Sequence, residues 1–162
     1  MTKAAKAIPE GDRTVTPYLT VRGADRAIEY YKQAFGAEEL LRMPGPDGKG
    51  IMHAEIKVGD SKVFLSDEFP GMGSRSPETL GGSTASVHLY VEDVDAVFNR
   101  AVTAGAKVRM PVADMFWGDR YGKVMDPFGH EWGIATHKED LTAEEIGQRA
   151  AAFFAEMGKK TQ

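Results

Sequence analysis

The sequence predicts an α+β fold built from two tandem βαβββ modules, followed by a C-terminal helix. Two observations support this prediction. The chain matches itself once at an offset of 70 residues, which indicates a duplicated structural unit. Each half also shows the same order of patterns, namely an alternating strand, an amphipathic helix and three shorter strands. The anchoring pairs of the repeat are Val21 with Val91, Asp25 with Asp95 and Gly59 with Gly129.

The first half opens with apolar residues that alternate with hydroxyl-bearing residues between Val15 and Val21. A period of two indicates a strand with one face on a core. A helix is expected over residues 24–35, because apolar residues recur there at helical spacing and Gly36 is a natural helix stop. The remaining strands are expected over about 38–43, 50–58 and 61–67.

The second half repeats these patterns. Apolar and polar residues alternate from Ser86 to Val91, and a helical stripe follows over residues 93–104. Gly105 takes the place that Gly36 has in the first half. The remaining strands are expected over about 106–111, 121–126 and 130–136.

The rest of the chain consists of connections and ends. Residues 68–83 are rich in Gly, Pro and Ser and show no periodicity, which is typical of a linker. Thr142 and Glu145 form a capping box ahead of an apolar helical stripe. We therefore expect a disordered tail over 1–12, one domain over 13–140 with modules at about 13–67 and 84–137, a linker over 68–83 and a helix over 141–158.

Composition narrows the classes of protein. The 162 residues are 42% hydrophobic, which is enough for a core, and the net charge of -4 does not favour binding to nucleic acid. No apolar run approaches the roughly 20 residues of a membrane span, and the N-terminus lacks the apolar segment of a secretory signal. There are no cysteines, so disulfides and thiolate zinc sites are excluded. We expect a cytoplasmic protein that does not bind membranes.

Four motifs resemble the vicinal oxygen chelate superfamily, which includes glyoxalases, bleomycin-resistance proteins and extradiol dioxygenases. They are Asp126-Pro127-Phe128-Gly129-His130-Glu131-Trp132, Trp117-Gly118-Asp119-Arg120-Tyr121-Gly122, Ala135-Thr136-His137-Lys138-Glu139-Asp140 and His53-Ala54-Glu55. Together they are similar to the PhnB-like, glyoxalase-like branch. The resemblance covers about residues 13–140 and implies two curved sheets around a cleft. It is specific for the fold and less so for the reaction, since one scaffold hosts several chemistries.

The resemblance also implies where a metal would be held. Many members of the superfamily bind one divalent metal through His, Glu or Gln on the first and last strands of both modules. Those positions correspond here to Thr16, Val63, Ser86 and Gly133. Two of these residues have no donor atom in the side chain, and neutral hydroxyls bind zinc, iron and manganese poorly. We therefore expect no metal and no other cofactor, with a displaced metal site as the alternative.

Other residues are candidates for chemistry or for binding. Strand periodicity places His53, Glu55 and His88 on polar faces, and His with Glu is the usual acid–base pair near neutral pH. A structural role in hydrogen bonding is the competing interpretation. The expected lining of the cleft is Thr16, Tyr18, Ser86, Tyr90, Trp117 and Arg120. Together with Phe116, the aromatic members of this set could form a wall for a flat ligand, with ordinary packing as the alternative, which is favoured for Phe116. Arg120 could hold an anionic group or pair at the surface with Asp119 or Asp126.

Three functions follow from these residues. The first is binding of a small molecule in the cleft without a metal, and the missing metal ligands favour it. The second is a lyase, isomerase or dioxygenase of the glyoxalase type that uses a non-standard metal site or metal-free acid–base catalysis. The third is a non-catalytic interaction module. A homodimer is expected in each case, because small curved sheets leave faces and edges to be covered, and the C-terminal helix is a candidate for that contact.

Overall fold

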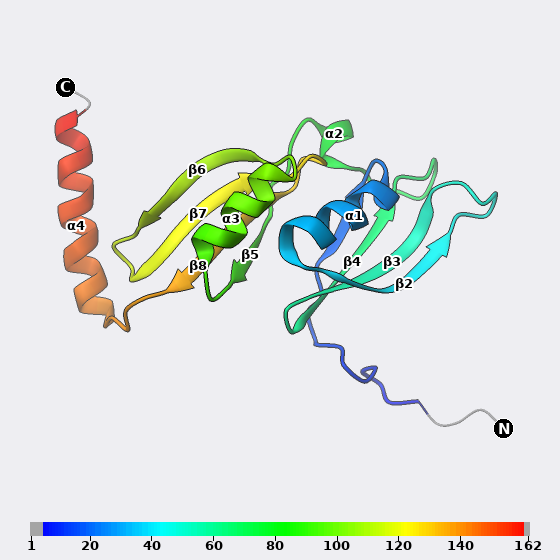
Figure 1. Ribbon diagram of the computed structural model, residues 1–162, viewed down its shortest axis with the longest axis horizontal. Helices are drawn as coiled ribbons and strands as arrows, with labels where there is room; N and C mark the ends of the chain where they lie inside the picture. Colours follow the sequence, from blue (N-terminus) through cyan, green and yellow to red (C-terminus); the bar gives the residue numbers. More distant parts are fainter. Residues whose placement is uncertain (1–4, 161–162) are drawn as a thin grey trace.

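The computed structural model describes residues 5–160 and confirms the predicted α+β fold. Residues 1–4, part of the expected disordered tail, lie outside the described residues. Two four-stranded sheets lie side by side along the long axis of the molecule, with helices α1 and α3 on one face and helix α4 at the far end (Figure 1). The 70-residue repeat therefore corresponds to two copies of one structural module.

Both modules contain the predicted elements. The first comprises β1 (Tyr18–Val21), α1 (Ala24–Phe35), β2 (Glu38–Pro44), β3 (Ile51–Val58) and β4 (Ser61–Asp67). The second comprises β5 (Ser86–Tyr90), α3 (Val94–Thr103), β6 (Lys107–Asp114), β7 (Asp119–Met125) and β8 (Glu131–His137). The strand orders are β1-β4-β3-β2 and β5-β8-β7-β6. In each sheet the first strand pairs with the last in parallel, and the other pairs are antiparallel.

A shared core joins the two modules. Helix α1 packs against α3, and the ring of Phe35 on α1 lies 4.6 Å from the ring of Trp132 on β8. Trp132 is completely buried. Its indole nitrogen donates to the carboxylate of Asp126 at 2.8 Å, and the hydroxyl of Tyr31 donates to the same oxygen at 2.7 Å. The first module thus contributes a helix to the core of the second.

Asp126 also explains the Asp-Pro-Phe-Gly motif at the level of the backbone. Its other carboxylate oxygen accepts hydrogen bonds from the backbone nitrogens of Phe128, at 2.9 Å, and His130, at 3.0 Å. Gly129 has a φ of 88°, which a residue with a Cβ rarely adopts. One buried carboxylate therefore closes the turn before β8 and binds the two core aromatics.

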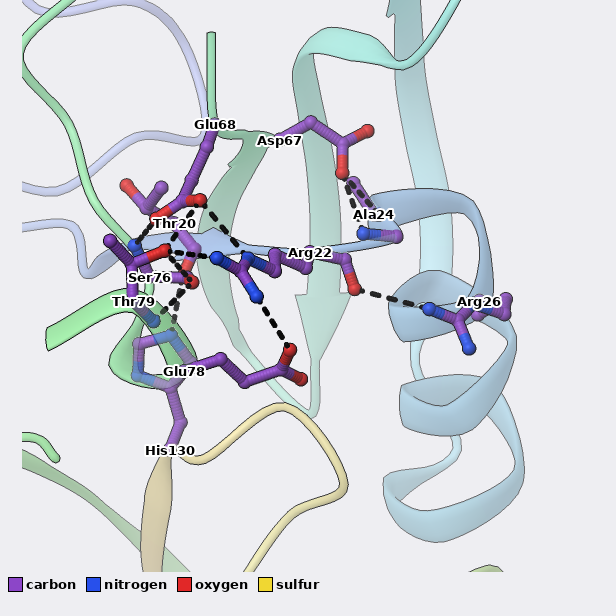
Figure 2. Close-up of polar contacts among 11 residues, drawn as sticks. Thr20, Arg22, Ala24, Arg26, Asp67, Glu68, Ser76, Glu78, Thr79 and His130 are labelled. Atoms are coloured by element: carbon purple, nitrogen blue, oxygen red, sulfur yellow. Dashed lines mark hydrogen bonds and ion pairs between the residues drawn. The ribbon is translucent and has the colours of Figure 1, made fainter. Parts of the chain in front are cut away.

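The linker is more ordered than its composition predicts. It contains a one-turn helix, α2 (Pro77–Leu80), and the Ser76 hydroxyl caps it by accepting from the backbone nitrogen of Thr79. Figure 2 shows how the linker is bound to the first module. Glu68 accepts from Arg22 at 3.3 Å, from the Thr79 hydroxyl at 2.8 Å and from the backbone nitrogen of Ser76.

The same region contacts the second module. The imidazole of His130 bonds the carbonyl of Thr20 at 2.8 Å (Figure 2). The carboxylate of Asp67 accepts from the backbone nitrogens of Gly23 and Ala24, at 2.7 and 2.9 Å, at the start of α1. A carboxylate is favourable there because these nitrogens have no partner inside the helix. The junction of β1, the linker and β8 is consequently a hydrogen-bonded seam.

The boundaries of several strands differ from the predictions. β1 begins at Tyr18 and not at Val15, which is exposed. β6 continues to Asp114 and β7 begins at Asp119, so the expected loop is a tight hairpin turn. In that turn the backbone nitrogen of Gly118 donates to the carbonyl of Met115 at 3.1 Å. The sequence predicted that this strand ends at Pro111, because proline interrupts the alternating pattern. In the structure β6 continues past Pro111, because the pairing of β6 with β7 is irregular there.

The C-terminal helix α4 (Ala143–Lys160) extends away from the domain (Figure 1). The predicted capping box is confirmed, since the nitrogen of Glu145 donates to the Thr142 hydroxyl at 3.2 Å and the nitrogen of Thr142 donates to the Glu145 carboxylate at 2.8 Å. None of the described residues of α4 is buried. Within residues 5–160, no helix combines the length and apolar character that a membrane span requires.

Candidate functional site

The register of the strands decides which residues share the polar faces of the sheets. Tyr18 pairs with Phe64, and His88 pairs with Gly133. Phe64 in β4 is therefore equivalent to Gly133 in β8, and the offset between these strands is one residue shorter than the 70 residues of the overall repeat. The alignment of Val63 with Gly133 was wrong, because Val63 pairs with Ile56 in the core and is only 3% exposed. A shift of one residue in a strand moves a side chain to the opposite face.

The corrected register does not produce a metal site. Phe64 replaces Val63 at the position in question and also has no donor atom, and Gly133 has no side chain. Thr16 and Ser86 offer neutral hydroxyls, which are weak ligands for transition metals. Within residues 5–160, no three His, Asp or Glu side chains converge in a way that could hold an ion. The side chains at these positions therefore do not fit the divalent metal that the resemblance implies.

The first module brings together three of the predicted residues. The hydroxyl of Tyr18 lies 2.8 Å from Nδ1 of His53, and Nε2 of His53 lies 3.4 Å from Glu55. Lys62 contacts the other oxygen of Glu55 at 3.4 Å and also pairs with Asp12. Both nitrogens of His53 thus have partners inside the protein, and half-exposed Tyr18 forms the outer end of this chain.

The second module has a more extensive cluster, centred on Asp119 at the start of β7. Its carboxylate accepts from the hydroxyl of Tyr90 at 2.9 Å and from the indole nitrogen of Trp117 at 3.1 Å. The other oxygen lies 2.7 Å from Nδ1 of His137, and Nε2 of His137 lies 2.9 Å from Asp140. Asp119 is only 4% exposed. Tyr90 and Trp117, both predicted for the cleft, are therefore held by one buried carboxylate.

The electrostatics of this cluster follow from its contacts. Burial opposes ionisation of Asp119, but hydrogen bonds from His137, Tyr90 and Trp117 outweigh it and lower the pKa of the carboxyl. The hydrogen bond to Asp119, with a further one to Asp140, raises the pKa of the His137 imidazole. The hydrogen bond to Asp119 likewise raises the pKa of the Tyr90 phenol. The arrangement favours an anionic Asp119 beside a protonated His137.

Aromatic rings line the surface next to Asp119. The ring of His88 stacks on Tyr121 at 5.6 Å with planes 8° apart, and it lies 4.8 Å from the ring of Tyr90. Trp117 lies 5.6 Å from Tyr121 in an edge-on arrangement. Gly133 leaves space beneath these rings, because a Cβ there would lie 2.9 Å from both His88 and Tyr121. We call Tyr90, His88, Tyr121 and Trp117 the aromatic wall.

The other predicted residues are not members of the aromatic wall. Arg120 points to the opposite side of β7 from Asp119, where it binds Asp95 at 2.7 and 2.8 Å and Asp114 at 3.2 Å. Ser86 is exposed at the start of β5, on the face of the strand that also carries His88 and Tyr90. Phe116 lies between the wall and α4, with its ring 5.0 Å from the ring of Trp117 and 5.4 Å from that of Phe153. The structure therefore separates Arg120 from the aromatic wall, whereas Ser86 and Phe116 lie at its edges.

A cavity of about 1080 Å³ lies between the modules and collects candidates from both of them. Thr16 lines it from the first module, and His88 and Tyr90 line it from β5 together with His137. Tyr18, His53 and Glu55 do not line it, and neither do Trp117 and Tyr121 of the aromatic wall. A second cavity of about 1100 Å³ lies at the turns after β1 and β2 and carries none of the predicted site residues. Of these two cavities, the inter-module cavity is thus the one that borders the aromatic wall, through His88 and Tyr90.

Sequence reasoning missed Asp119, Tyr121 and His137 as members of the expected site. The signal for two of them was the alternation of β7, which places Asp119, Tyr121 and Lys123 on one face. That alternation went unused because β7 was expected to begin at residue 121. The contact of Asp119 with His137 joins paired strands and follows only from the register.

Comparisons with known proteins agree with the geometry. The family model of the Glyoxalase/Bleomycin resistance protein/Dioxygenase superfamily matches residues 12–134. An uncharacterized protein of Mycobacterium bovis is 45% identical over 135 residues, which cover 82% of this chain and 88% of that protein. Protein YjdN of Escherichia coli is 31% identical over 149 residues, which cover 79% of this chain and 98% of that protein.

Solved structures share the architecture. A gene product from Arabidopsis thaliana matches with a TM-score of 0.63 and 28% identity, covering 76% of this chain and 98% of that chain. The PhnB protein from Bacillus cereus matches with a TM-score of 0.60 and 17% identity, covering 76% of this chain and 99% of that chain, and shows the fold alone. The repeat, the paired sheets and the family match lead to one conclusion: the chain belongs to the glyoxalase/bleomycin resistance protein/dioxygenase superfamily.

Proposed function

We propose that this protein binds a small aromatic molecule on the aromatic wall, next to the inter-module cavity that His88 and Tyr90 line, without a metal or other cofactor. The observation that carries the proposal is the exposed ring cluster fixed by a buried carboxylate. Tyr90 is 65% exposed even though its hydroxyl is held by Asp119. Exposed aromatic rings in a cavity that also holds a few polar groups are typical of small-molecule sites.

His88 supplies the polar contact in this proposal. Its ring stacks on Tyr121 and lies at a tilt against Tyr90, and no described hydrogen bond engages its imidazole. A planar ligand that lies on the rings could therefore exchange a hydrogen bond with His88. The cationic side chains of Arg13, Lys62 and Arg100 line the cavity together with the carboxylates of Asp60 and Glu92. Because the cations outnumber the carboxylates, an aromatic acid is the ligand class that we propose.

Titration with 2-naphthoate, followed by tryptophan fluorescence, tests the proposal. The chain has two tryptophans, of which Trp132 is fully buried and Trp117 belongs to the aromatic wall. Binding should quench the emission of Trp117, and this quenching should be absent in Trp117→Phe. Binding should also raise Tm, because a ligand that binds only the folded state stabilises it. His88→Ala should weaken binding at least tenfold, whereas the matched variant His53→Ala in the other module should not. Equal loss in both variants, or no binding by the wild type of 2-naphthoate and related aromatic acids, would refute the proposal.

A second candidate function is metal-free acid–base catalysis of the glyoxalase type by the Tyr18–His53–Glu55 chain. The hydrogen bonds that join the three side chains favour it, because Glu55 would orient His53, and His53 would take a proton from Tyr18. Assays of glyoxalase-type lyase activity and of catechol ring cleavage test it. Turnover should be lost in Tyr18→Phe while 2-naphthoate still binds. Absence of turnover in the wild type in both assays would leave binding as the function.

We also propose that two copies of the chain associate through α4 and that the protein works in the cytoplasm. Phe154 is 60% exposed on α4, and Phe153 next to it is also exposed. An apolar stripe on a helix without buried residues is stabilised when a second copy covers it. The absence of cysteines suits a reducing compartment. Sedimentation of the purified protein measures the association, and a monomer at micromolar concentration would exclude it.

A further inference from the structure

Asp119 holds the side chains of Tyr90 and Trp117 in the aromatic wall in one orientation. Tyr90 is largely exposed and Trp117 lies in a hairpin turn, so neither side chain is fixed by packing alone. Each flexible side chain that a ligand must immobilise weakens binding, because ordering the side chain costs conformational entropy. Side chains that are already fixed in the free protein avoid that cost.

The contacts of Asp119 join three separate segments of the second module. Tyr90 comes from β5, Trp117 from the turn between β6 and β7, and His137 from the end of β8. Tyr90 and Trp117 share the oxygen Oδ2, while His137 binds Oδ1. With both oxygens bound and the residue almost fully buried, Asp119 has no free surface for a ligand. Any effect it has on binding must act through the residues it holds.

His137 is the cationic group that pairs with the negative charge of Asp119. The neighbouring cation Arg120 is directed to Asp95 and Asp114 on the other side of β7. Among the described ion pairs, the only cationic partner of Asp119 is His137, which also binds Asp140. The remaining titratable groups around the cluster are Tyr90, which donates to Asp119, and His88 and Tyr121, whose rings lie against Tyr90 or one another.

We infer that Asp119 is the positioning residue of the site, holding Tyr90 and Trp117 in the orientation that binds an aromatic ligand, and that the proton on His137 strengthens this hold. The inference rests on the proposed function. It makes affinity for an aromatic acid highest when His137 is protonated. As the pH rises and His137 loses its proton, Asp119 keeps its charge but loses its counterion, so the wall is less firmly held and the ligand binds more weakly.

The test combines a ligand measurement with two measurements that need no ligand. Asp119→Asn removes the charge but keeps the shape of the side chain. Asp140→Asn is the matched control, because it removes the other carboxylate on His137 and leaves Tyr90 and Trp117 untouched. The readouts are the affinity for 2-naphthoate from pH 5 to 9, quenching of Trp117 by iodide, and the titration of His137 by NMR.

We expect Asp119→Asn to bind 2-naphthoate at least tenfold more weakly at pH 6 and with an affinity independent of the titration of His137. Iodide should quench Trp117 more in this variant, with Trp117→Phe giving the baseline of Trp132. Asp140→Asn should keep the affinity at pH 6, with the pH midpoint shifted downward. Tyr90→Phe should weaken binding of 2-naphthoate three- to tenfold and leave iodide quenching of Trp117 unchanged. This variant tests the inference if Asp119→Asn does not fold.

The inference is overturned if Asp119→Asn retains the affinity and the pH profile of the wild type, or if Tyr90→Phe binds as the wild type does. The proposed function fails in a different way, by absence of 2-naphthoate binding in the wild type. In that case the iodide quenching and the His137 titration still report whether Asp119 fixes Trp117, and unchanged values in Asp119→Asn would refute that part as well.

Discussion

The hydroxyl of Tyr31 donates to the carboxylate of Asp126 across the boundary between the modules, at a distance of 2.7 Å. Both residues are almost completely buried, and they lie 95 positions apart in the chain. Burial, together with the charge of Asp126, raises the pKa of the Tyr31 phenol, so Tyr31 remains a neutral donor. One hydrogen bond thus connects helix α1 to the turn that starts the last strand.

Tyr31→Phe should lower the free energy of unfolding by about 1–3 kcal/mol, because it leaves a buried carboxylate oxygen with one donor fewer. Urea unfolding followed by circular dichroism measures this change. Tyr18→Phe is the matched control, since Tyr18 is half exposed and its loss should cost less than about 1 kcal/mol. Equal effects of the two substitutions would show that the Tyr31–Asp126 bond does not stabilise the module boundary.

Acid should weaken the linker seam through Glu68. Hydrogen bonds from the backbone of Ser76 and from Thr79 lower the pKa of Glu68 from 4.5 to about 2. Because the pKa is lower in the folded state, the stabilisation is complete above about pH 4.5 and is lost as the pH falls toward 2. Urea midpoints should therefore fall between pH 5 and pH 3 in the wild type, and less so in Glu68→Gln.

Glu78→Gln is the control for that experiment. Glu78 lies in the same linker and pairs with Arg22 at 3.7 Å, but its side chain is more exposed than that of Glu68. Its removal should leave the acid dependence as in the wild type. Identical slopes in all three proteins would mean that Glu68 does not couple the seam to pH.

Gly133→Ala should disturb the aromatic wall. The new methyl group would lie 2.9 Å from His88 and from Tyr121, so the two rings must move apart. Overpacking of this kind costs about 1–3 kcal/mol, and here it also removes the space beneath the rings. We expect lower stability in urea and weaker binding of 2-naphthoate.

The matched glycine is Gly147 in α4, where a Cβ would meet nothing within 4 Å. Gly147→Ala should leave binding unchanged and stabilise the helix by up to about 1 kcal/mol, since alanine is the better helix former. Binding of 2-naphthoate by Gly133→Ala with the affinity of the wild type would argue against a ligand on the wall.

The fold could be predicted from the sequence because its signals are local. The alternation in β5 and the helical stripe of α1 identify these elements within a few residues, and the 70-residue offset identifies the duplication. The wall could be predicted only in part. The positions of His88 and Tyr90 follow from the alternation within one strand. The grouping of Tyr90 and Trp117 around Asp119 depends on the register of β7 and on the β6–β7 hairpin, which was not predicted because Pro111 interrupts the pattern of β6.

The error at Val63 has the same origin. The repeat fixed β1 against β5, but a local pattern does not set the offset of β4 against β8, and a difference of one residue reverses the face. The one-turn helix α2 was missed for another reason. Its hydrogen bonds depend on Ser76, and one turn is too short to show a period.

Replacing both Phe153 and Phe154 by serine should convert the proposed dimer into a monomer. The two rings are exposed on α4, and within the chain their described ring contacts are with Phe116 and with each other. Burying two phenylalanines against a second copy contributes several kcal/mol to association, at about 1.5–3 kcal/mol for each fully buried side chain. Light scattering measures the mass, and urea unfolding of the dilute monomer should show almost no loss, because α4 contains no buried residue. Glu156→Ser in the same turn is the control and should remain dimeric. A double serine variant that keeps the mass of the wild type would place the contact elsewhere on the sheets.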